Sequence, residues 1–308
     1  MSHARADTGD GPVAPPHLRR MIVGVDGHPE GRDATALAAA VSRATGAEAV
    51  LVAVLADPLI VPLTGLSWKE LHKHAEQMLA QTRDEIAPDA RVAMETDFSV
   101  ARALERVAAR EHADLVVLGS SPQGPTRKVR IGYRTRQLIG DAHCALAVAP
   151  RGFAEAGAPA IERIGVGYDG GPESVAALAL AGTIARAAGA ELSVRAVVDD
   201  RIPTFGLRGS RGARIVAEWE SLVAGDVEEL RKQAVEAAKS GGVDAHVEVL
   251  SGRPAELLLE LCEEVDLLVI GSRRWGTVAR LLLGSTGEAL MHGAASPVLV
   301  VPRTHATP

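Results

Sequence analysis

The chain alternates short apolar runs with longer segments in which apolar residues recur every three or four positions. Short apolar runs are typical of buried strands, and the longer pattern is typical of helices that cover a sheet. A strand at Met21–Val25, for example, precedes a helix whose apolar face includes Ala34, Leu37 and Val41. Strands that alternate with helices predict right-handed crossovers and a parallel sheet with helices on both faces. The predicted fold class is therefore α/β, doubly wound.

This order of elements occurs twice. The segment VGVDGHPE at 23–30 matches VGYDGGPE at 166–173, and Asp114 recurs as Asp266. The offset between the copies grows from 143 to 152 residues, so the second copy contains an insertion of nine residues. A repeat of this length indicates a duplicated domain. We predict two tandem doubly wound domains, each with a five-stranded parallel sheet flanked by helices.

Both copies carry the same signals for the ends of their first helix. Pro29 and Pro172 are expected at the first helical position, where the missing N–H is not needed. Gly46 and Gly189 are expected to end these helices in the left-handed conformation. The predicted strands are Met21–Val25, Ala49–Leu55, Arg91–Glu95, Leu115–Gly119 and Ala145–Ala149 in the first domain, and Arg163–Tyr168, Leu192–Val198, Ala245–Leu250, Leu267–Gly271 and Val298–Val301 in the second.

Composition places the domain boundaries. Residues 152–161 are rich in Gly, Ala and Pro and are expected to form a short exposed linker. It separates a first domain at 19–151 from a second domain at 162–303. Residues 1–18 are expected to be a disordered tail, and residues 304–308 a C-terminal tail.

Charge and composition exclude several classes of function. The net charge is −6, which gives no support to a nucleic-acid partner. No run of 18 or more apolar residues occurs, and the N-terminal residues lack the apolar stretch of a signal peptide. We therefore expect a cytoplasmic protein without a membrane partner. Cys144 and Cys262 lie in apolar runs and are expected to be small buried hydrophobic residues.

Candidate chemistry lies at the carboxyl ends of the strands, where ligands bind in open α/β sheets. Asp26 and Asp169 end the first strand of their domains. A carboxylate in this place can accept hydrogen bonds from an adenine amino group or a ribose hydroxyl. Alternatively, the Asp-Gly pair forms a turn and caps the following helix. The sequence leaves both interpretations open.

The loop after the strand Leu267–Gly271 has the features of a phosphate site. Its glycines allow the backbone to approach phosphate oxygens, and a helix that starts at Ser285 directs free N–H groups towards an anion. Between Gly271 and Gly287 there are three arginines and no Asp or Glu. The alternative is a surface loop followed by a serine N-cap.

In these features the sequence resembles the universal stress protein family, and in particular its tandem two-domain members, over about Arg20 to Arg303. The family's phosphate loop has the pattern Gly, two residues, Gly, nine residues, Gly, then Ser or Thr, which Gly271, Gly284 and Ser285 match. The resemblance implies that the side chain of Asp169 and the backbone of Val197 contact adenine. It implies ATP or AMP as ligand, with Mg²⁺ only if ATP is bound. The candidate site comprises Asp169, Val197, Gly271, Arg274, Gly276, Gly284, Ser285 and Thr286.

The two domains depart from the family pattern to different degrees. In the second domain Arg274 replaces the second glycine, and its side chain either blocks the phosphate path or binds phosphate itself. In the first domain Pro122 replaces that glycine and Tyr133 replaces the hydroxyl residue, so we expect a degenerate site. The basic residues that follow form either a solvated face or an anion site. They are Arg127, Lys128, Arg130, Arg134 and Arg136.

No arrangement of residues for acid–base or covalent catalysis is visible, and the ten histidines show no metal spacing. Three functions stay open: a nucleotide-binding stress-response regulator that is not an enzyme, an interaction module with decayed sites, and a weak ATPase. The resemblance also implies that the domains form a pseudo-dimer within the chain. Val298–Val301 is then expected to lie antiparallel to Ala145–Ala149, because open apolar edge strands favour pairing. Further assembly into a homo-oligomer is left open.

Overall fold

A computed structural model of the 308-residue chain describes residues 17–55, 67–141, 144–157, 159–201, 210–272 and 283–302. Most of the predicted N-terminal tail and the whole predicted C-terminal tail lie outside these ranges. In the first half the elements are β1 (Arg20–Gly24), α1 (Pro29–Thr45), β2 (Glu48–Leu55), α2 (Trp68–Ile86), β3 (Arg91–Thr96), α3 (Val100–Arg110), β4 (Leu115–Gly119), α4 (Tyr133–Asp141) and β5 (Ala145–Ala149).

The second half repeats this order after a short 3-10 helix, η2 (Ala154–Ala156). Its elements are β6 (Arg163–Tyr168), α5 (Pro172–Ala188), β7 (Glu191–Asp199), α6 (Ser210–Ser240), β8 (His246–Gly252), α7 (Pro254–Glu264), β9 (Leu267–Gly271), α8 (Ser285–Leu290) and β10 (Val298–Val301). The mixed α/β fold agrees with the sequence-based prediction, and the predicted strand ends differ from those of the structure by no more than two residues.

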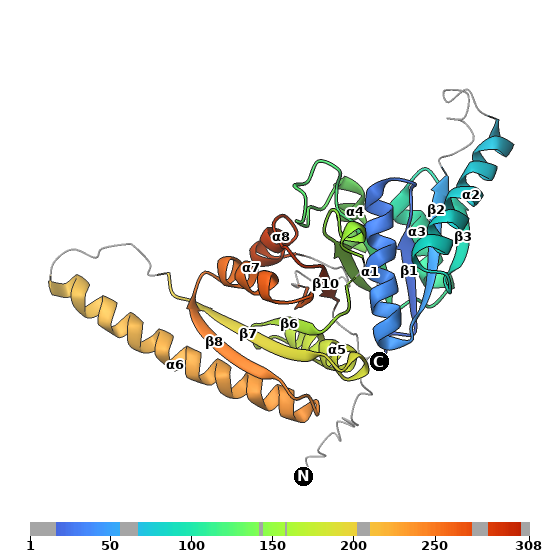
Figure 1. Cartoon of the computed structure of the whole chain (residues 1–308). Helices are drawn as coiled ribbons and strands as arrows, with labels where there is room; N and C mark the ends of the chain where they lie inside the picture. The colour runs from blue at the N-terminus through green and yellow to red at the C-terminus, as the bar shows by residue number, and fades with distance from the viewer. Residues whose placement is uncertain are drawn as a thin grey trace, which may run out of the picture.

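All of these strands belong to one sheet, in the order β3-β2-β1-β4-β5-β10-β9-β6-β7-β8. The two halves meet in its centre, where β10 runs antiparallel to β5, with Leu299 opposite Ala147 and Val300 opposite Leu146. This is the pairing expected between the last strand of the first half and the last strand of the second. The other neighbouring strands run parallel, as βαβ connections require. Figure 1 shows the blue-to-green and the yellow-to-red halves that meet in this way.

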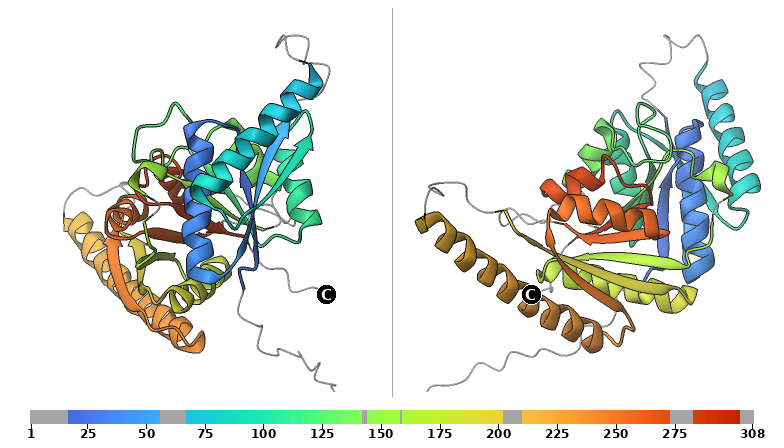
Figure 2. Two further views of the ribbon diagram at one scale, coloured as in Figure 1. Left: turned by 45° about the vertical axis from the view of Figure 1, so that its right-hand side comes forward. Right: turned by 60° about the vertical axis from the view of Figure 1, so that its left-hand side comes forward.

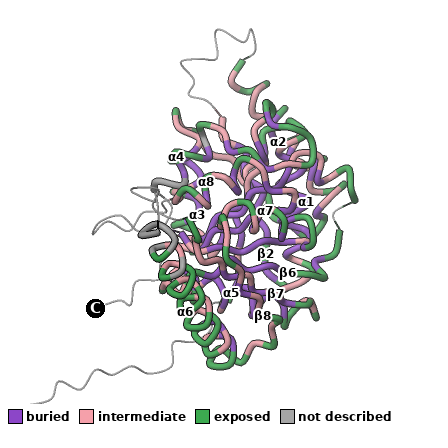
Figure 3. Tube along the Cα trace, turned by 90° about the vertical axis from the view of Figure 1, so that its left-hand side faces the viewer, coloured by how far each residue is buried: buried purple, intermediate pink, exposed green. Residues whose placement is uncertain are grey.

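Apolar side chains pack on both faces of the sheet. Met21 and Val23 belong to one buried cluster and Ile22 to the other, because successive side chains of a strand point to opposite faces. The first cluster lies under α1, α2, α5 and α6, and the second lies under α3, α4, α7 and α8. Figure 3 shows that buried residues concentrate in the strands, whereas α6 is largely exposed. Each cluster contains residues of both halves, so the halves share their core.

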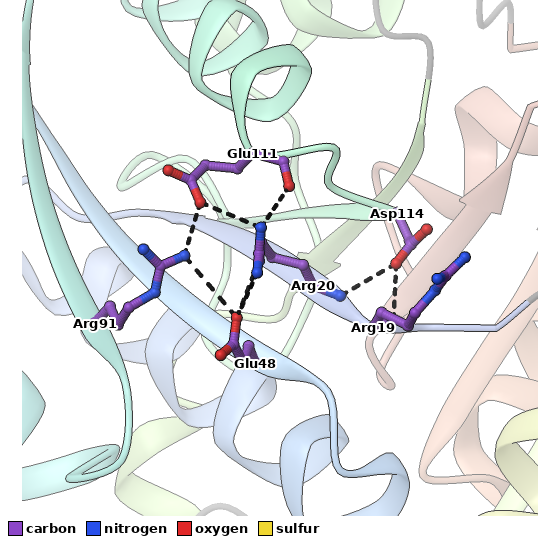
Figure 4. Close-up of polar contacts among 6 residues, drawn as sticks. All are labelled: Arg19, Arg20, Glu48, Arg91, Glu111 and Asp114. Atoms are coloured by element: carbon purple, nitrogen blue, oxygen red, sulfur yellow. Dashed lines mark hydrogen bonds and ion pairs between the residues drawn. The ribbon is translucent and has the colours of Figure 1, made fainter.

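Asp114, which recurs as Asp266, has a structural role that Figure 4 shows for the first half. The Oδ2 atom of Asp114 accepts hydrogen bonds from the N–H groups of Arg19 (2.7 Å) and Arg20 (3.1 Å), at the start of β1. The Oδ2 atom of Asp266 accepts the equivalent hydrogen bonds from the N–H groups of Glu162 (3.1 Å) and Arg163 (2.9 Å). Each acid thus ties the beginning of the first strand to the neighbouring fourth strand, which is a structural role present in both copies.

The segment between the halves is more ordered than the sequence suggests. Phe153 and Ile161 are buried, and the Asp33 carboxylate of α1 accepts hydrogen bonds from the N–H groups of Gly152 and Ala154, both at 2.8 Å. The prediction of a simply exposed linker is therefore wrong for its first residues. The reason is a contact between residues about 120 positions apart, which local composition does not reveal.

We expect Asp33→Ala to lower the free energy of unfolding by about 2 kcal/mol, because it leaves two backbone donors without their acceptor. Burial raises the pKa of the Asp33 carboxyl above 3.8, although the hydrogen bonds from Ala154 and Gly152 act in the opposite direction. Since the folded-state pKa is the higher one, wild-type stability relative to Asp33→Asn should fall as the pH rises from about 4. Urea denaturation of the three proteins across pH 4–7 measures both effects. A stability difference that grows with pH would contradict the assigned direction.

Candidate functional site

A cleft of about 720 Å³ lies in the second half, at the carboxyl ends of β6, β7 and β9. In open α/β sheets, ligands bind beyond the carboxyl ends of the strands, so a ligand site is expected at this edge. Arg274 and Gly276 lie outside the described residues. The cleft brings together the other predicted site residues, which are Asp169, Val197, Gly271, Gly284, Ser285 and Thr286.

Asp169 occupies a tight turn between β6 and α5. Its Oδ1 accepts the Gly171 N–H at 3.0 Å, and Gly170 has a φ of 79°, a left-handed conformation that favours glycine. Asp26 makes the matching contact with the His28 N–H at 3.2 Å in the first half. The turn is thus present in both copies. The expected capping by the acid is wrong, because the N-caps of the following helices are His28 and Gly171, without a side-chain cap. The turn is compatible with ligand binding, because the Asp169 side chain is exposed and lines the cleft.

Gly271 has a packing role that does not involve a ligand. A Cβ at this position would lie 2.5 Å from the carbonyl carbon of Glu173, at the start of α5. The equivalent Cβ at Gly119 would lie 2.0 Å from the carbonyl oxygen of Glu30. Only glycine permits this approach of helix and strand. The recurrence of the glycine therefore does not by itself indicate a phosphate loop.

The short helix α8 forms one wall of the cleft. It begins at Ser285, as predicted, but its N-cap is Gly284, without a side-chain cap. The alternative of a serine N-cap is therefore wrong. Ser285 is exposed and Thr286 is half-buried. The N–H groups of this first turn have no acceptor within the helix, which leaves them available to an acceptor in the cleft.

The charges of the described lining are largely paired. The side chain of Arg195, only 11% exposed, contacts Glu248 at 2.9 Å. Arg201 pairs with Asp199, and Arg253 pairs with Glu256 at 2.7 Å. This part of the cleft therefore offers no excess of positive charge. The acid-free, arginine-bearing stretch that the sequence indicates lies mainly at 273–282, outside the described residues.

Glu173 is a lining residue that the sequence analysis missed. Its Oε1 is buried and has no hydrogen-bond partner among the described residues. A buried carboxylate oxygen without a donor is costly, so a donor on a bound molecule would be favourable here. Its position two residues after the Asp-Gly-Gly turn, matched by Glu30 in the first copy, is the signal that could have identified it.

The corresponding loop of the first half is engaged with the second half. Lys128 lies 3.7 Å from Glu263, and Arg136 lies 3.0 Å from Glu288. Both side chains are ion-paired but stay partly exposed, at 38% for Lys128 and 44% for Arg136, so the solvated face is retained here with acidic partners from the second half. The pairing partners come from distant parts of the sequence, so the local run of basic residues could not reveal them. The side chain of Arg134 lies outside the described residues.

Cys262 is buried, as expected, whereas Cys144 is only half-buried. Burial raises the pKa of the Cys262 thiol to about 11, and that of the half-buried Cys144 also to about 11, so both resist ionisation at neutral pH. Within the described ranges, no group of His, Cys, Asp or Glu side chains could hold a metal ion. Nor is any helix in that part of the chain long and apolar enough to cross a membrane.

The chain is an α/β protein with two tandem halves and a cleft at the carboxyl ends of one set of strands. The chain belongs to the universal stress protein family, whose sequence profile matches residues 17–150 and 160–302. A universal stress protein of Mycobacterium tuberculosis is 27% identical over 292 residues, which cover 91% of this chain and 96% of the relative. One from Methanocaldococcus jannaschii is 33% identical over 142 residues, covering 46% of this chain and 81% of the relative.

Solved structures show the same fold. The crystal structure of a universal stress protein from Archaeoglobus fulgidus superposes with a TM-score of 0.64 at 19% identity, covering 93% of this chain and 99% of the other. At this identity the likeness concerns the fold alone.

Proposed function

We propose that the cleft of the second domain binds an adenine nucleotide, ATP or AMP, and that the protein is a stress-response regulator and not an enzyme. The observation that carries this proposal is the convergence of the six described candidate residues on one cleft. Its volume of about 720 Å³ lies in the range of small-molecule pockets. A nucleotide assay on freshly purified, denatured protein tests it, and the absence of adenine nucleotide there and in titrations would contradict it.

The geometry favours one orientation of the nucleotide. Asp169 and Val197 line one side of the cleft and suit the base and ribose, since a carboxylate and a backbone carbonyl accept hydrogen bonds. Ser285 and Thr286, on the wall formed by α8, suit the phosphates. If ATP is the ligand, Mg²⁺ would accompany its phosphates.

We propose that the first domain binds nucleotide far more weakly. Pro122 and Tyr133 occupy the glycine and hydroxyl positions of its loop, and the Tyr133 side chain is 75% exposed instead of facing a cleft wall. Because the halves share one sheet and both apolar clusters, the two domains are compared by substitutions in the whole chain and not as separate fragments. Asp26→Ala should leave nucleotide affinity unchanged, whereas Asp169→Ala should weaken it. The reverse pattern would place the nucleotide in the first domain.

We expect Ser285→Ala to cost about 1–2 kcal/mol of nucleotide binding, the scale of a hydrogen bond to a charged group. The reason is that its hydroxyl lines the cleft at the start of α8. Titration calorimetry of the full chain with ATP measures the change. Ser240→Ala, at the far end of α6, is the matched control and should bind as the wild type does. An unchanged affinity of Ser285→Ala would remove this residue from the site.

Two other functions are distinguished by simple measurements. An interaction module with decayed sites would contain no nucleotide after purification. A weak ATPase would release phosphate steadily, and a single substitution in the cleft would abolish the release. The proposal of a regulator requires bound nucleotide without such turnover.

We also propose that the two domains form an intramolecular pseudo-dimer, which the antiparallel pairing of β5 with β10 supports. Further assembly into a homo-oligomer would then use other surfaces. Sedimentation of the full chain tests this. A cytoplasmic location stays a prediction.

A further inference from the structure

The helix α8 lines the cleft of the second domain at its beginning and contacts the first domain at its end. Gly284, Ser285, Thr286 and Leu290 line the cleft of the second domain. The helix has only six residues, and so short a helix is not stable without tertiary contacts. Its position, and thus the shape of this wall of the cleft, depends on what packs against its other end.

The first domain contacts that other end through residues 120–132, which we call the bridging loop. The N–H of Ile131 donates to the carbonyl oxygen of Met291, the C-cap of α8, at 3.0 Å. The N–H of Val129 donates to the carbonyl oxygen of Ala294 at 2.8 Å. Carbonyls at the end of a helix have no partner within it, so the bridging loop supplies the donors that α8 lacks.

Apolar burial joins the same two segments. Val129 and Ile131 are 0% and 4% exposed, and Leu290 and Met291 are both 0% exposed. All four residues belong to one buried cluster. The end of α8 is thus part of a core to which both domains contribute.

A polar contact completes the attachment. The Nη1 of Arg136, in α4, donates to Oε1 of Glu288, in α8, at 3.0 Å. Its Nη2 lies 3.0 Å from Nε2 of His292, and Nδ1 of His292 lies 2.7 Å from the carbonyl oxygen of Glu288. Because a guanidinium only donates, Nε2 must accept and Nδ1 must donate. Figure 3 shows α4 and α8 next to each other.

We propose that the bridging loop and Arg136 are positioning elements for the cleft of the second domain. The bridging loop corresponds to the proposed phosphate loop of the second domain. In the first domain it instead holds α8 in the conformation that binds the ligand. This inference rests on the proposed nucleotide site for its ligand. If α8 spends only a fraction of the time in its position, the apparent affinity falls by that fraction. By linkage, nucleotide binding also stabilises the contact between the domains.

The test uses the full chain with R136E, E288R and the double variant R136E/E288R. R32E is the matched control, because Arg32 of α1 forms an ion pair of similar exposure with Glu85 of α2, at 2.7 Å within the first domain, and the variant makes the same change in charge. Amide hydrogen exchange of residues 285–294 is measured without nucleotide, and the affinity for ATP by calorimetry. We expect each single reversal to accelerate exchange and to weaken ATP binding about fivefold, the upper scale of an exposed ion pair. The double variant should recover to within about twofold.

The outcomes separate the two proposals. Unchanged exchange in both single variants, or equal acceleration in R32E, would overturn the positioning role whether or not ATP binds. Faster exchange with unchanged ATP affinity would overturn the link between α8 and the cleft. A wild type that binds no ATP would overturn the proposed function, and the exchange measurements would then decide on the attachment of α8 by themselves.

Discussion

Val300→Asp should lower the free energy of unfolding by about 4 kcal/mol or more, because it buries a charge without a partner. Val300 is 0% exposed and lies on β10, opposite Leu146 of β5 and beside Ile270 of β9. It therefore lies where the two halves of the sheet join. A loss of this size is a large share of the stability of an ordinary domain.

The effect should extend to both halves, because they share the sheet and both apolar clusters. Single-tryptophan variants that retain Trp68 in α2 or Trp219 in α6 report on the first and the second half. We expect the unfolding transitions reported by the two tryptophans to shift together to a lower denaturant concentration. Val92→Asp is the matched control, since Val92 lies on the edge strand β3 with 41% exposure, and it should cost less than about 0.5 kcal/mol. A shift of Trp219 alone would contradict the shared core.

Local patterns accounted for most of the fold. Pro29 and Pro172 begin their helices, and Gly46 and Gly189 end them with φ values of 75° and 66°. These signals act over a few residues, and the duplication supplied each of them twice. Contacts between distant residues were not accessible in this way. Asp33 holds the segment after β5, although its sequence neighbourhood is an ordinary helix.

The same distinction applies to the candidate site. The spacing of Gly284 and Ser285 from Gly271 pointed to one cleft, because parallel strands bring their carboxyl ends to the same edge. Which charges of the cleft are neutralised depends on packing, and the pairing of Arg195 with Glu248 could not be seen from the sequence. Nor could the sequence show that the bridging loop of the first domain contacts the end of α8.

The duplication has a physical consequence that a single domain lacks. A domain that binds no ligand retains a role if its loop completes the packing of its partner, since a short helix such as α8 depends on that packing. Figure 2 shows the two halves from two sides, with α6 running along the outer edge beside β8 and the junction of the halves near the centre. Substitutions at the bridging loop should therefore affect the second domain although they lie in the first.

Gly284→Arg should raise the dissociation constant for ATP at least about 100-fold, a loss of about 3 kcal/mol of binding free energy. Gly284 has a φ of −75° and a ψ of 178°, a conformation open to any residue, so the change does not strain the backbone. Because Gly284 lines the cleft next to Ser285, the arginine side chain would occupy the space proposed for the phosphates.

Gly225→Arg is the matched control for this substitution. A Cβ at Gly225 would meet nothing within 4 Å, and arginine is a better helix former than glycine, so this variant should keep both its stability and its affinity for ATP. Circular dichroism establishes that both variants are folded, and calorimetry with ATP compares them. Tighter binding by Gly284→Arg would show that the guanidinium reaches the phosphates, and the steric explanation would then be wrong. Unchanged binding would instead place the nucleotide away from α8, because no side chain of this length could lie in the cleft without contact with its ligand.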